Sequence, residues 1–208
     1  MNHVIAHVSA SQFDTFADAD AEPFVGGEGC NRAWWYQYVM GLPRPFSAAA
    51  ARGSEIHKKL ENHMLHGAAL TPDLVQHVTK YIPSADLIKS RAVLVEKSIG
   101  LDVGDTGIKL KGFVDLWARL RIDDWKTSSD VKWFKSKEEL QKNTQMLIYG
   151  YANTLEFSQG PDFVTLAHNQ LLVPRNSSTV TYAQRTETRV PAQDTIKFWK
   201  TTAIPLTQ

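Results

Sequence analysis

Apolar and polar positions divide the chain into a helical first part and a second part rich in strands. After Thr71-Pro72-Asp73, a good helix start, apolar residues recur at helical spacing at Leu74, Val78 and Ile82. From Ala92 onward they alternate with polar ones and are often β-branched, which is typical of strands. The pattern predicts helices over 31–40, 47–66 and from Thr71 to Ile82, strands over 92–103, 108–120 and 121–127, a helix over 137–157, strands over 163–173 and 178–184, and a short helix over 195–201.

Helix caps and turns support this division. Ser9 to Phe13 has the form of a capped helix start, the Gly-rich stretch 17–29 is predicted to be a loop, and Gly67 ends the helix of 47–66. The segment 104–107 is a hairpin turn signal. The order of elements predicts one α/β domain over residues 1–208, with a mainly helical part over 1–90 and the core of a mixed sheet over 91–208.

Composition narrows the class of protein. The chain has 208 residues, 43% of them hydrophobic, which is enough for one domain with a proper core. Its net charge of +1 gives no strong overall field, so a nucleic-acid surface would be a local patch. The single cysteine, Cys30, excludes a four-thiolate cluster built from this chain alone. The sequence shows neither a signal peptide nor a membrane-length apolar run, and we expect a cytoplasmic protein.

Two carboxylates interrupt the apolar strands. Asp115 stands in the first of them, and Asp124 opens the triplet Asp124-Trp125-Lys126 in the second. Residues two apart on a strand share a face, so Asp124 and Lys126 point the same way. Buried carboxylates need a partner. A divalent cation that prefers hard oxygen ligands, such as Mg²⁺ or Mn²⁺, is a suitable one. A plain strand salt bridge between Asp124 and Lys126 is the alternative.

These residues belong to an ordered set of motifs. In chain order the set runs from Ser9-Phe13 through 30–36 to Gly53-Ser54 with His57, then 112–115, 124–127 and 145–151. It resembles the RecB-type branch of the PD-(D/E)XK nuclease superfamily, which includes phage exonucleases and CRISPR-associated RecB-like nucleases. The resemblance covers about Ser9 to Tyr151. It implies a restriction-endonuclease-like fold, a mixed central sheet flanked by helices, with an N-terminal helical elaboration.

The resemblance also implies roles for individual residues. His57, Asp115 and Asp124 correspond to metal ligands, and the backbone carbonyl of Trp125 to a further one. Lys126 is expected to orient or activate the attacking water. In the helix after the sheet, two residues are expected to contact DNA or to hold the lysine; they are Gln145 and Tyr149.

The implied activity is a deoxyribonuclease that uses one or two Mg²⁺ or Mn²⁺ ions on double-stranded ends or single strands of DNA. An exonuclease of recombination, repair or phage DNA processing is the expected form, alone, as a homo-oligomer or with a recombination partner. A structure-specific or CRISPR-adaptation endonuclease and a catalytically silent DNA-binding subunit are the alternatives. Relatives with an iron–sulfur cluster carry four cysteines, so we expect no cluster here. The gap from Asp115 to Asp124 is short for the family and demands a tight turn without glycine.

Several residues keep two readings. Glu61 lies one helical turn after His57, so its side chain is expected either to reach the site or to be an exposed charge on the helix. Asp123 is expected to face solvent or pair with a basic residue, Glu96 is a weak site candidate, and His168 is expected to be structural. The segment Lys132–Lys137, which interleaves basic and aromatic residues, is either a nucleic-acid contact or a solvated helix start.

Overall fold

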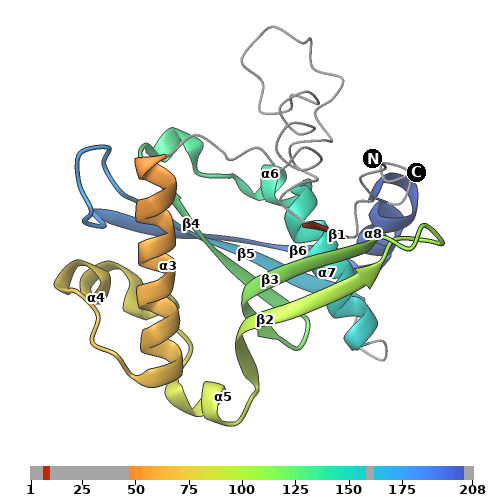
Figure 1. Ribbon diagram of the computed structural model, residues 1–208, viewed down its shortest axis with the longest axis horizontal. Helices are drawn as coiled ribbons and strands as arrows, with labels where there is room; N and C mark the ends of the chain where they lie inside the picture. Colours follow the sequence, from red (N-terminus) through yellow and green to blue (C-terminus); the bar gives the residue numbers. More distant parts are fainter. Residues whose placement is uncertain (1–6, 10–46, 158–161, 204–208) are drawn as a thin grey trace, which may run out of the picture.

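A mixed sheet forms the centre of the computed structural model, which describes residues 7–9, 47–157 and 162–203 (Figure 1). The strand order is β1-β3-β4-β5-β6, and β2 pairs with β3 outside that path. Pairings β1–β3 and β4–β5 are parallel, and the others are antiparallel. The strands are β1 His7–Ser9, β2 Val93–Asp102, β3 Lys109–Ala118, β4 Arg121–Ser128, β5 Phe163–Leu172 and β6 Tyr182–Pro191.

Helices flank this sheet, as the sequence predicts. One hydrophobic cluster joins the sheet to α7 and contains Trp117, Ile122 and Met146. A second joins it to α3 and contains Leu60 and Trp125. The helices are α3 Ala48–His66, α4 Pro72–Val78, η2 Thr79–Tyr81, α5 Ala85–Lys89, η3 Val131–Trp133, α6 Lys137–Gln141, α7 Thr144–Glu156, α8 Ala192–Phe198 and a π-helical turn, η4, Trp199–Ala203.

Local sequence explains the ends of α3. The Ser47 side chain accepts a hydrogen bond from the Ala50 N–H at the N-terminus. Gly67 ends the helix with a left-handed φ of 69°, which glycine adopts without steric cost. The predicted helix over 47–66 is therefore confirmed. None of the described helices is long and apolar enough to cross a membrane.

Some predicted elements differ from the structure. The helix over 137–157 is two helices, because Asn143 caps α7 with its side chain and its extended backbone ends α6. The strand over 178–184 is β6, which begins at Tyr182 and runs to Pro191 to pair with all of β5. The last helix begins at Ala192 rather than 195.

Three further differences concern the first half of the chain. The helix after Thr71 is α-helical only to Val78 and continues as η2. Ser9, predicted as a helix cap, ends strand β1, whose partner is Lys109–Lys111 of β3. The structure adds a short helix, α5, that the pattern did not predict. The predicted loop over 17–29, the helix over 31–40 and Cys30 lie outside the described residues.

The turn between β3 and β4 needs no glycine. Leu120 adopts a left-handed φ of 57° there. The side chain of Asn153, fully buried in α7, accepts from the Leu120 N–H at 3.0 Å and donates to the Ala118 carbonyl at 3.0 Å. These two bonds satisfy the turn backbone and offset the left-handed conformation. A tight turn of this kind is what the short spacing from Asp115 to Asp124 demands.

Candidate active site

One edge of β3 is open in its middle. The first part of this edge, Lys109–Lys111, pairs with β1, and its last part, Leu116–Ala118, pairs with β4. No described strand pairs with the edge between them. Beyond Asp123, β4 pairs with β5 alone among the described strands. The sheet therefore splits beside Asp115, and backbone groups and side chains of β3 and β4 face one another across the split.

The two predicted carboxylates meet at this split. Asp115 Oδ2 accepts a hydrogen bond from the Trp125 N–H at 2.6 Å, which joins β3 to β4 through a side chain. Asp124, one residue earlier on β4, is only 4% exposed, and Asp115 is 9% exposed. Two carboxylates held this close in a buried setting repel each other unless cations compensate.

His57 reaches the split from α3. Its Nδ1 lies 3.4 Å from Asp115 Oδ1. Gly53, one turn earlier, makes the approach possible, because a Cβ at that position would lie 2.7 Å from Thr127 Oγ1 of β4. Burial lowers the pKa of His57, but the hydrogen bond and charge of Asp115 and the charge of Asp124 raise it more, so the net direction is upward. The protonated imidazole is therefore favoured beside the Asp115 carboxylate.

Lys126 is held from two sides. Its Nζ lies 2.8 Å from Asp124 Oδ2 and donates to Gln145 Oε1 at 2.8 Å. Gln145 in turn donates to the Tyr149 hydroxyl at 3.1 Å, and that hydroxyl donates to the Phe113 carbonyl at 2.9 Å. Burial and the charge of Asp124 raise the pKa of Tyr149, so the phenol keeps its proton. This chain of bonds fixes the lysine, one of the two roles the sequence left open for Gln145 and Tyr149.

A glycine makes room for the chain of bonds. At Gly112 on β3 an added Cβ would lie 3.0 Å from the Tyr149 ring and 3.3 Å from its hydroxyl. Such contacts are tighter than ordinary van der Waals packing and would push the ring aside. The glycine in the motif of residues 112–115 therefore makes room for Tyr149, three strand positions before Asp115.

The pKa values of the two carboxylates shift in opposite directions. Burial raises the pKa of Asp115, but the hydrogen bond and charge of His57 and the Trp125 N–H lower it, so the net shift is downward. Burial also raises the pKa of Asp124; Lys126 lowers it and Asp115 raises it again, leaving a net rise. Asp124 Oδ2 has the Lys126 charge beside it but no hydrogen bond of good geometry. The folded protein therefore disfavours the charged form of Asp124 more than that of Asp115.

Glu96, a weak site candidate from the sequence, belongs to this cluster. It lies on β2 between positions paired with Val114 and Leu116, opposite Asp115, and its φ is 51°. A left-handed glutamate costs about 1 kcal/mol or more, a form of strain that concentrates at functional sites. Burial, the charge and hydrogen bond of Asp115 and the charge of Glu61 raise the pKa of Glu96 to about 7. Strand alternation cannot reveal a residue whose backbone leaves the strand conformation.

The raised pKa of Glu96 predicts how stability depends on pH. A carboxyl with a folded pKa of about 7 and an ordinary value of 4.5 stabilises the fold below pH 4.5, and that contribution is lost as the pH rises through 7. After allowance for solvent screening, we expect a loss of about 1 kcal/mol, or about 2–4 °C in Tm, without divalent cations. Thermal melts of Glu96→Gln between pH 4.5 and 8 should lack this decline. Glu138→Gln, an exposed control on α6, should keep it, and an unchanged decline in Glu96→Gln would contradict the assignment.

The donor set fits a hard divalent cation. One imidazole, two buried carboxylates and a nearby backbone carbonyl, that of Trp125, match the ligands of Mg²⁺ and Mn²⁺. Within the described residues, no three His, Cys, Asp or Glu side chains lie in an arrangement that could hold a metal ion. His57 and Lys126 instead supply the positive charges that face Asp115 and Asp124. If His57 is a ligand of an ion here, its ligating nitrogen must be unprotonated.

Two other acidic candidates have partners of their own. Asp123 is buried at 4% exposure, and its carboxylate pairs with Arg121 at 2.7 Å and Arg185 at 3.0 Å. It pairs with basic residues, as one of the two predictions held, and it does not face solvent. Glu61 pairs with Lys58 at 2.9 Å on α3, although its charge also acts on Glu96.

His168 and the basic–aromatic segment complete the comparison with the sequence. His168 pairs in register with Asp124 and is 1% exposed. Burial and the charges of Lys126 and Lys135 lower its pKa to about 3, so it is a neutral part of the core. In the segment after β4, Trp133 is 63% exposed with Lys132 over its ring, while Ser136 forms a capping box that starts α6. The predicted helix start is thus confirmed, and the nucleic-acid contact stays a prediction.

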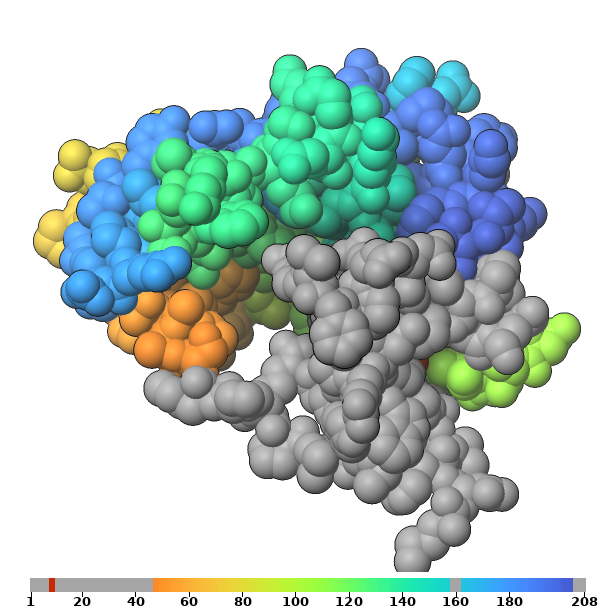
Figure 2. Space-filling view, turned by 90° about the horizontal axis from the view of Figure 1, so that it is seen from above, coloured from red at the N-terminus to blue at the C-terminus, as the bar shows by residue number. Residues whose placement is uncertain are grey.

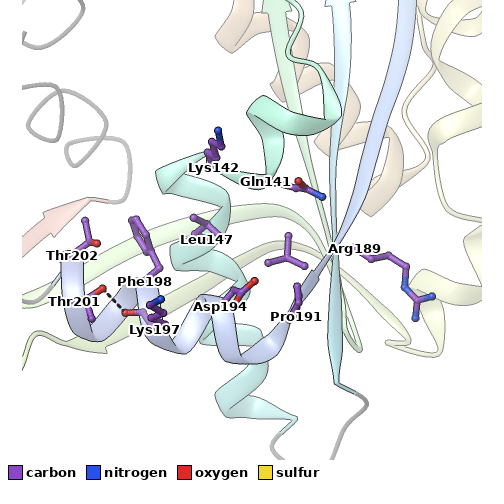
Figure 3. Close-up of a pocket in the computed structure, with 11 residues that line it drawn as sticks. Gln141, Lys142, Leu147, Arg189, Pro191, Asp194, Lys197, Phe198, Thr201 and Thr202 are labelled. Atoms are coloured by element: carbon purple, nitrogen blue, oxygen red, sulfur yellow. Dashed lines mark hydrogen bonds between the residues drawn. The ribbon is translucent and has the colours of Figure 1, made fainter.

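A large cavity lies away from the split in the sheet. Its volume is about 630 Å³, and its walls come from α6, α7, β6 and the C-terminal helices. Figure 3 shows Asp194 and Lys197 on α8, while the Arg189 side chain points away from the other labelled residues. Among the described residues that line it, Asp194 is the one acidic residue, so these residues offer no counterpart to the paired carboxylates at the split in the sheet.

Comparison with known proteins supports the fold. No protein-family model matches this sequence, and no curated protein is similar to it in sequence. Among solved structures, the chain is similar to one from Eubacterium rectale named "Putative exonuclease", with a TM-score of 0.59 and 12% identity over 97% of this chain and 80% of that one. A phage related exonuclease from Haemophilus somnus 129PT covers 79% of this chain and 87% of its own at 15% identity, but its TM-score of 0.31 is too low to define a shared fold. The chain shares the fold of the Eubacterium rectale structure, and in this chain it is a mixed sheet flanked by helices.

Proposed function

We propose that this chain is a metal-dependent deoxyribonuclease of the RecB-like type that hydrolyses phosphodiester bonds. One observation carries the proposal: Asp115 and Asp124 meet at the split in the sheet, with Lys126 held beside Asp124 by Gln145. A salt bridge alone would not need the second buried carboxylate, the approach of His57 or the chain of bonds behind the lysine. The fold shared with the Eubacterium rectale structure agrees with this activity.

Each residue of the site has a task in this proposal. His57, Asp115, Asp124 and the Trp125 carbonyl hold one or two Mg²⁺ or Mn²⁺ ions. Bound there, the ion supplies Lewis-acid chemistry that makes water a better nucleophile and offsets charge on the phosphate. Lys126 places a positive charge beside the nucleophile, and Gln145 keeps the ammonium group aimed at the site. Tyr149 holds Gln145 and remains a proton donor.

Exonuclease action is the proposed mode, and it rests on the family resemblance. The test compares linear, circular and end-blocked DNA, double- and single-stranded, with Mg²⁺ or Mn²⁺ and with EDTA. Loss of linear DNA together with survival of circular and end-blocked DNA is expected. Cleavage of circular DNA would favour the endonuclease alternative. Binding of DNA without cleavage under any of these conditions would favour the catalytically silent subunit.

A further inference from the structure

A second cavity lies beside the active site. Its volume is about 240 Å³, and it is formed where the first turns of α3 meet the end of β4. Figure 2 shows the segment that follows β4, in green, beside the N-terminal part of α3, in orange. The volume equals about eight water molecules at 30 Å³ each, enough for a phosphate group. The lining that matters here consists of Arg52, Gly53, Thr127, Ser128, Ser129 and Val173.

Arg52 is the cation of this cavity. It is half-buried, and it forms no hydrogen bond or ion pair with any residue that the structure describes. Other basic residues of α3 are paired: Lys58 with Glu61 at 2.9 Å and Lys59 with Glu55 at 2.7 Å. A guanidinium group that is partly withdrawn from water and lacks an anion is ready to bind one, and its fork of donors matches phosphate oxygens.

Hydroxyl groups line the opposite wall. Thr127 and Ser129 form no side-chain hydrogen bond within the described residues, so both hydroxyls are available as donors. Ser128 is engaged with the backbone of Asp130, donating to its carbonyl and accepting from its N–H. The Asp130 carboxylate accepts from the Lys132 N–H at 3.0 Å and lies 3.7 Å from Lys132 Nζ. The nearest acidic group in this turn is therefore already occupied.

The cavity is close to the bond-cutting residues. Arg52 precedes His57 by five residues, about 7.5 Å along a helix, and Thr127 directly follows Lys126. Successive nucleotides of a strand advance by about 3.4 Å along a duplex, so this separation corresponds to about two nucleotide steps. A strand that passes His57 therefore has a phosphate about two nucleotide steps further along within reach of Arg52, on the face of β4 to which Thr127 points and which is opposite to Lys126.

We propose that this cavity binds a phosphate group of the nucleic-acid strand next to the bond that is cut, with Arg52 as the charged contact and Thr127 and Ser129 as hydroxyl donors. The position relative to the cut rests on the proposed function. The phosphate group is either an internal phosphodiester or a terminal 5′-phosphate, since both present the same oxygens to Arg52. The site fixes the register of the strand and reads no base.

DNA binding tests this site independently of cleavage. Fluorescence anisotropy is measured with Mn²⁺ on a labelled duplex with a single-stranded overhang, in a Lys126→Ala background that keeps the strand intact. Adding Arg52→Ala should weaken binding about tenfold for any base sequence and reduce the slope of log K against log salt by about one. Arg52→Lys should recover part of the loss, because it keeps the charge but not the fork. Lys89→Ala, an exposed lysine on α5, is the control of equal charge.

Neutral backbone substitutions identify the phosphate group. Methylphosphonates are placed one at a time along the strand. One of these positions should weaken DNA binding by the Lys126→Ala protein. At that position the methylphosphonate should not weaken binding further when Arg52→Ala is also present. Substrates with a 5′-phosphate or a 5′-hydroxyl distinguish a terminal from an internal group. If Arg52→Ala matches Lys89→Ala in affinity and salt slope, or if the parent binds no DNA, the site is refuted. Binding as expected in a wild type that cuts no DNA would refute the proposed function and leave the phosphate site standing.

Discussion

Asp124→Asn is expected to lower the rate of DNA cleavage by about a thousandfold or more and, in EDTA, to raise Tm. The activity falls because the proposed ion loses a buried carboxylate ligand, and several kcal/mol of stabilisation correspond to a thousandfold or more in rate. Stability rises because burial and the charge of Asp115 raise the pKa of Asp124, so the folded protein disfavours the anion. The amide keeps the shape of the side chain and removes that charge.

The adjacent residue provides the matched control. Asp123→Asn changes the same group one position earlier, but Asp123 pairs with Arg121 and Arg185. Breaking this buried pairing is expected to cost about 2 kcal/mol, since both arginines keep some contact with solvent. Thermal melts in EDTA should therefore move in opposite directions for the two variants.

Titration with Mn²⁺ completes this test. The wild type should gain Tm with increasing Mn²⁺, because an ion that binds the folded state alone stabilises it, and Asp124→Asn should not. Asp123→Asn should show the same Mn²⁺-dependent rise in Tm as the wild type, starting from a lower Tm in the absence of Mn²⁺. A wild type without any Mn²⁺-dependent rise in Tm, or an Asp124→Asn variant that still cuts DNA at the normal rate, would remove the basis for the metal site.

Lys126→Ala is expected to reduce cleavage by about 10²–10³-fold, the usual effect of losing one preorganised charge from an active site. The ammonium group lies 2.8 Å from both Asp124 Oδ2 and Gln145 Oε1, so its position is fixed before substrate binds. The loss should appear in kcat more than in KM, because the charge acts on the reacting phosphate. Lys132→Ala, an exposed lysine after β4, is the control and should affect kcat little.

A double-mutant cycle tests whether Gln145 acts through Lys126. Gln145→Ala alone should lower kcat by a smaller factor, because the lysine keeps its pairing with Asp124 but loses its second anchor. In the Lys126→Ala background the same change should have almost no further effect, since groups that act as a unit are not additive. Additive losses would show that Gln145 has a separate role, such as a direct contact with DNA.

Sequence reasoning was successful where local rules dominate. Ser47 and Gly67 mark the ends of α3 through hydrogen bonding and a left-handed φ, and both signals are visible in the residue types. It failed at 137–157, because the helical pattern continues through Asn143, whose side chain accepts a hydrogen bond from the Met146 N–H and so starts a new helix. It also placed β6 too early, because the partner strand β5 decides which residues pair.

Glu96 shows the same limit of prediction from local sequence, this time at the candidate active site. Its participation depends on a left-handed φ and on lying opposite Asp115, and neither property is encoded in a short sequence motif. The cavity at Arg52 is similar, because its two walls are more than seventy residues apart in the chain. Asp123 is a further example, since one of the two arginines that pair with its buried carboxylate, Arg185, comes from the distant strand β6.

The sequence by itself determined the succession of helices and strands around a mixed sheet and the residue types of the candidate site, because periodicity and motif spacing are local properties of the chain. The tertiary structure alone decided that β3 loses its partner beside Asp115, that Gln145 and Tyr149 hold Lys126, and that Glu96 turns toward the carboxylates. Those arrangements depend on strand pairing and on contacts between distant segments, whose free energies no local pattern contains.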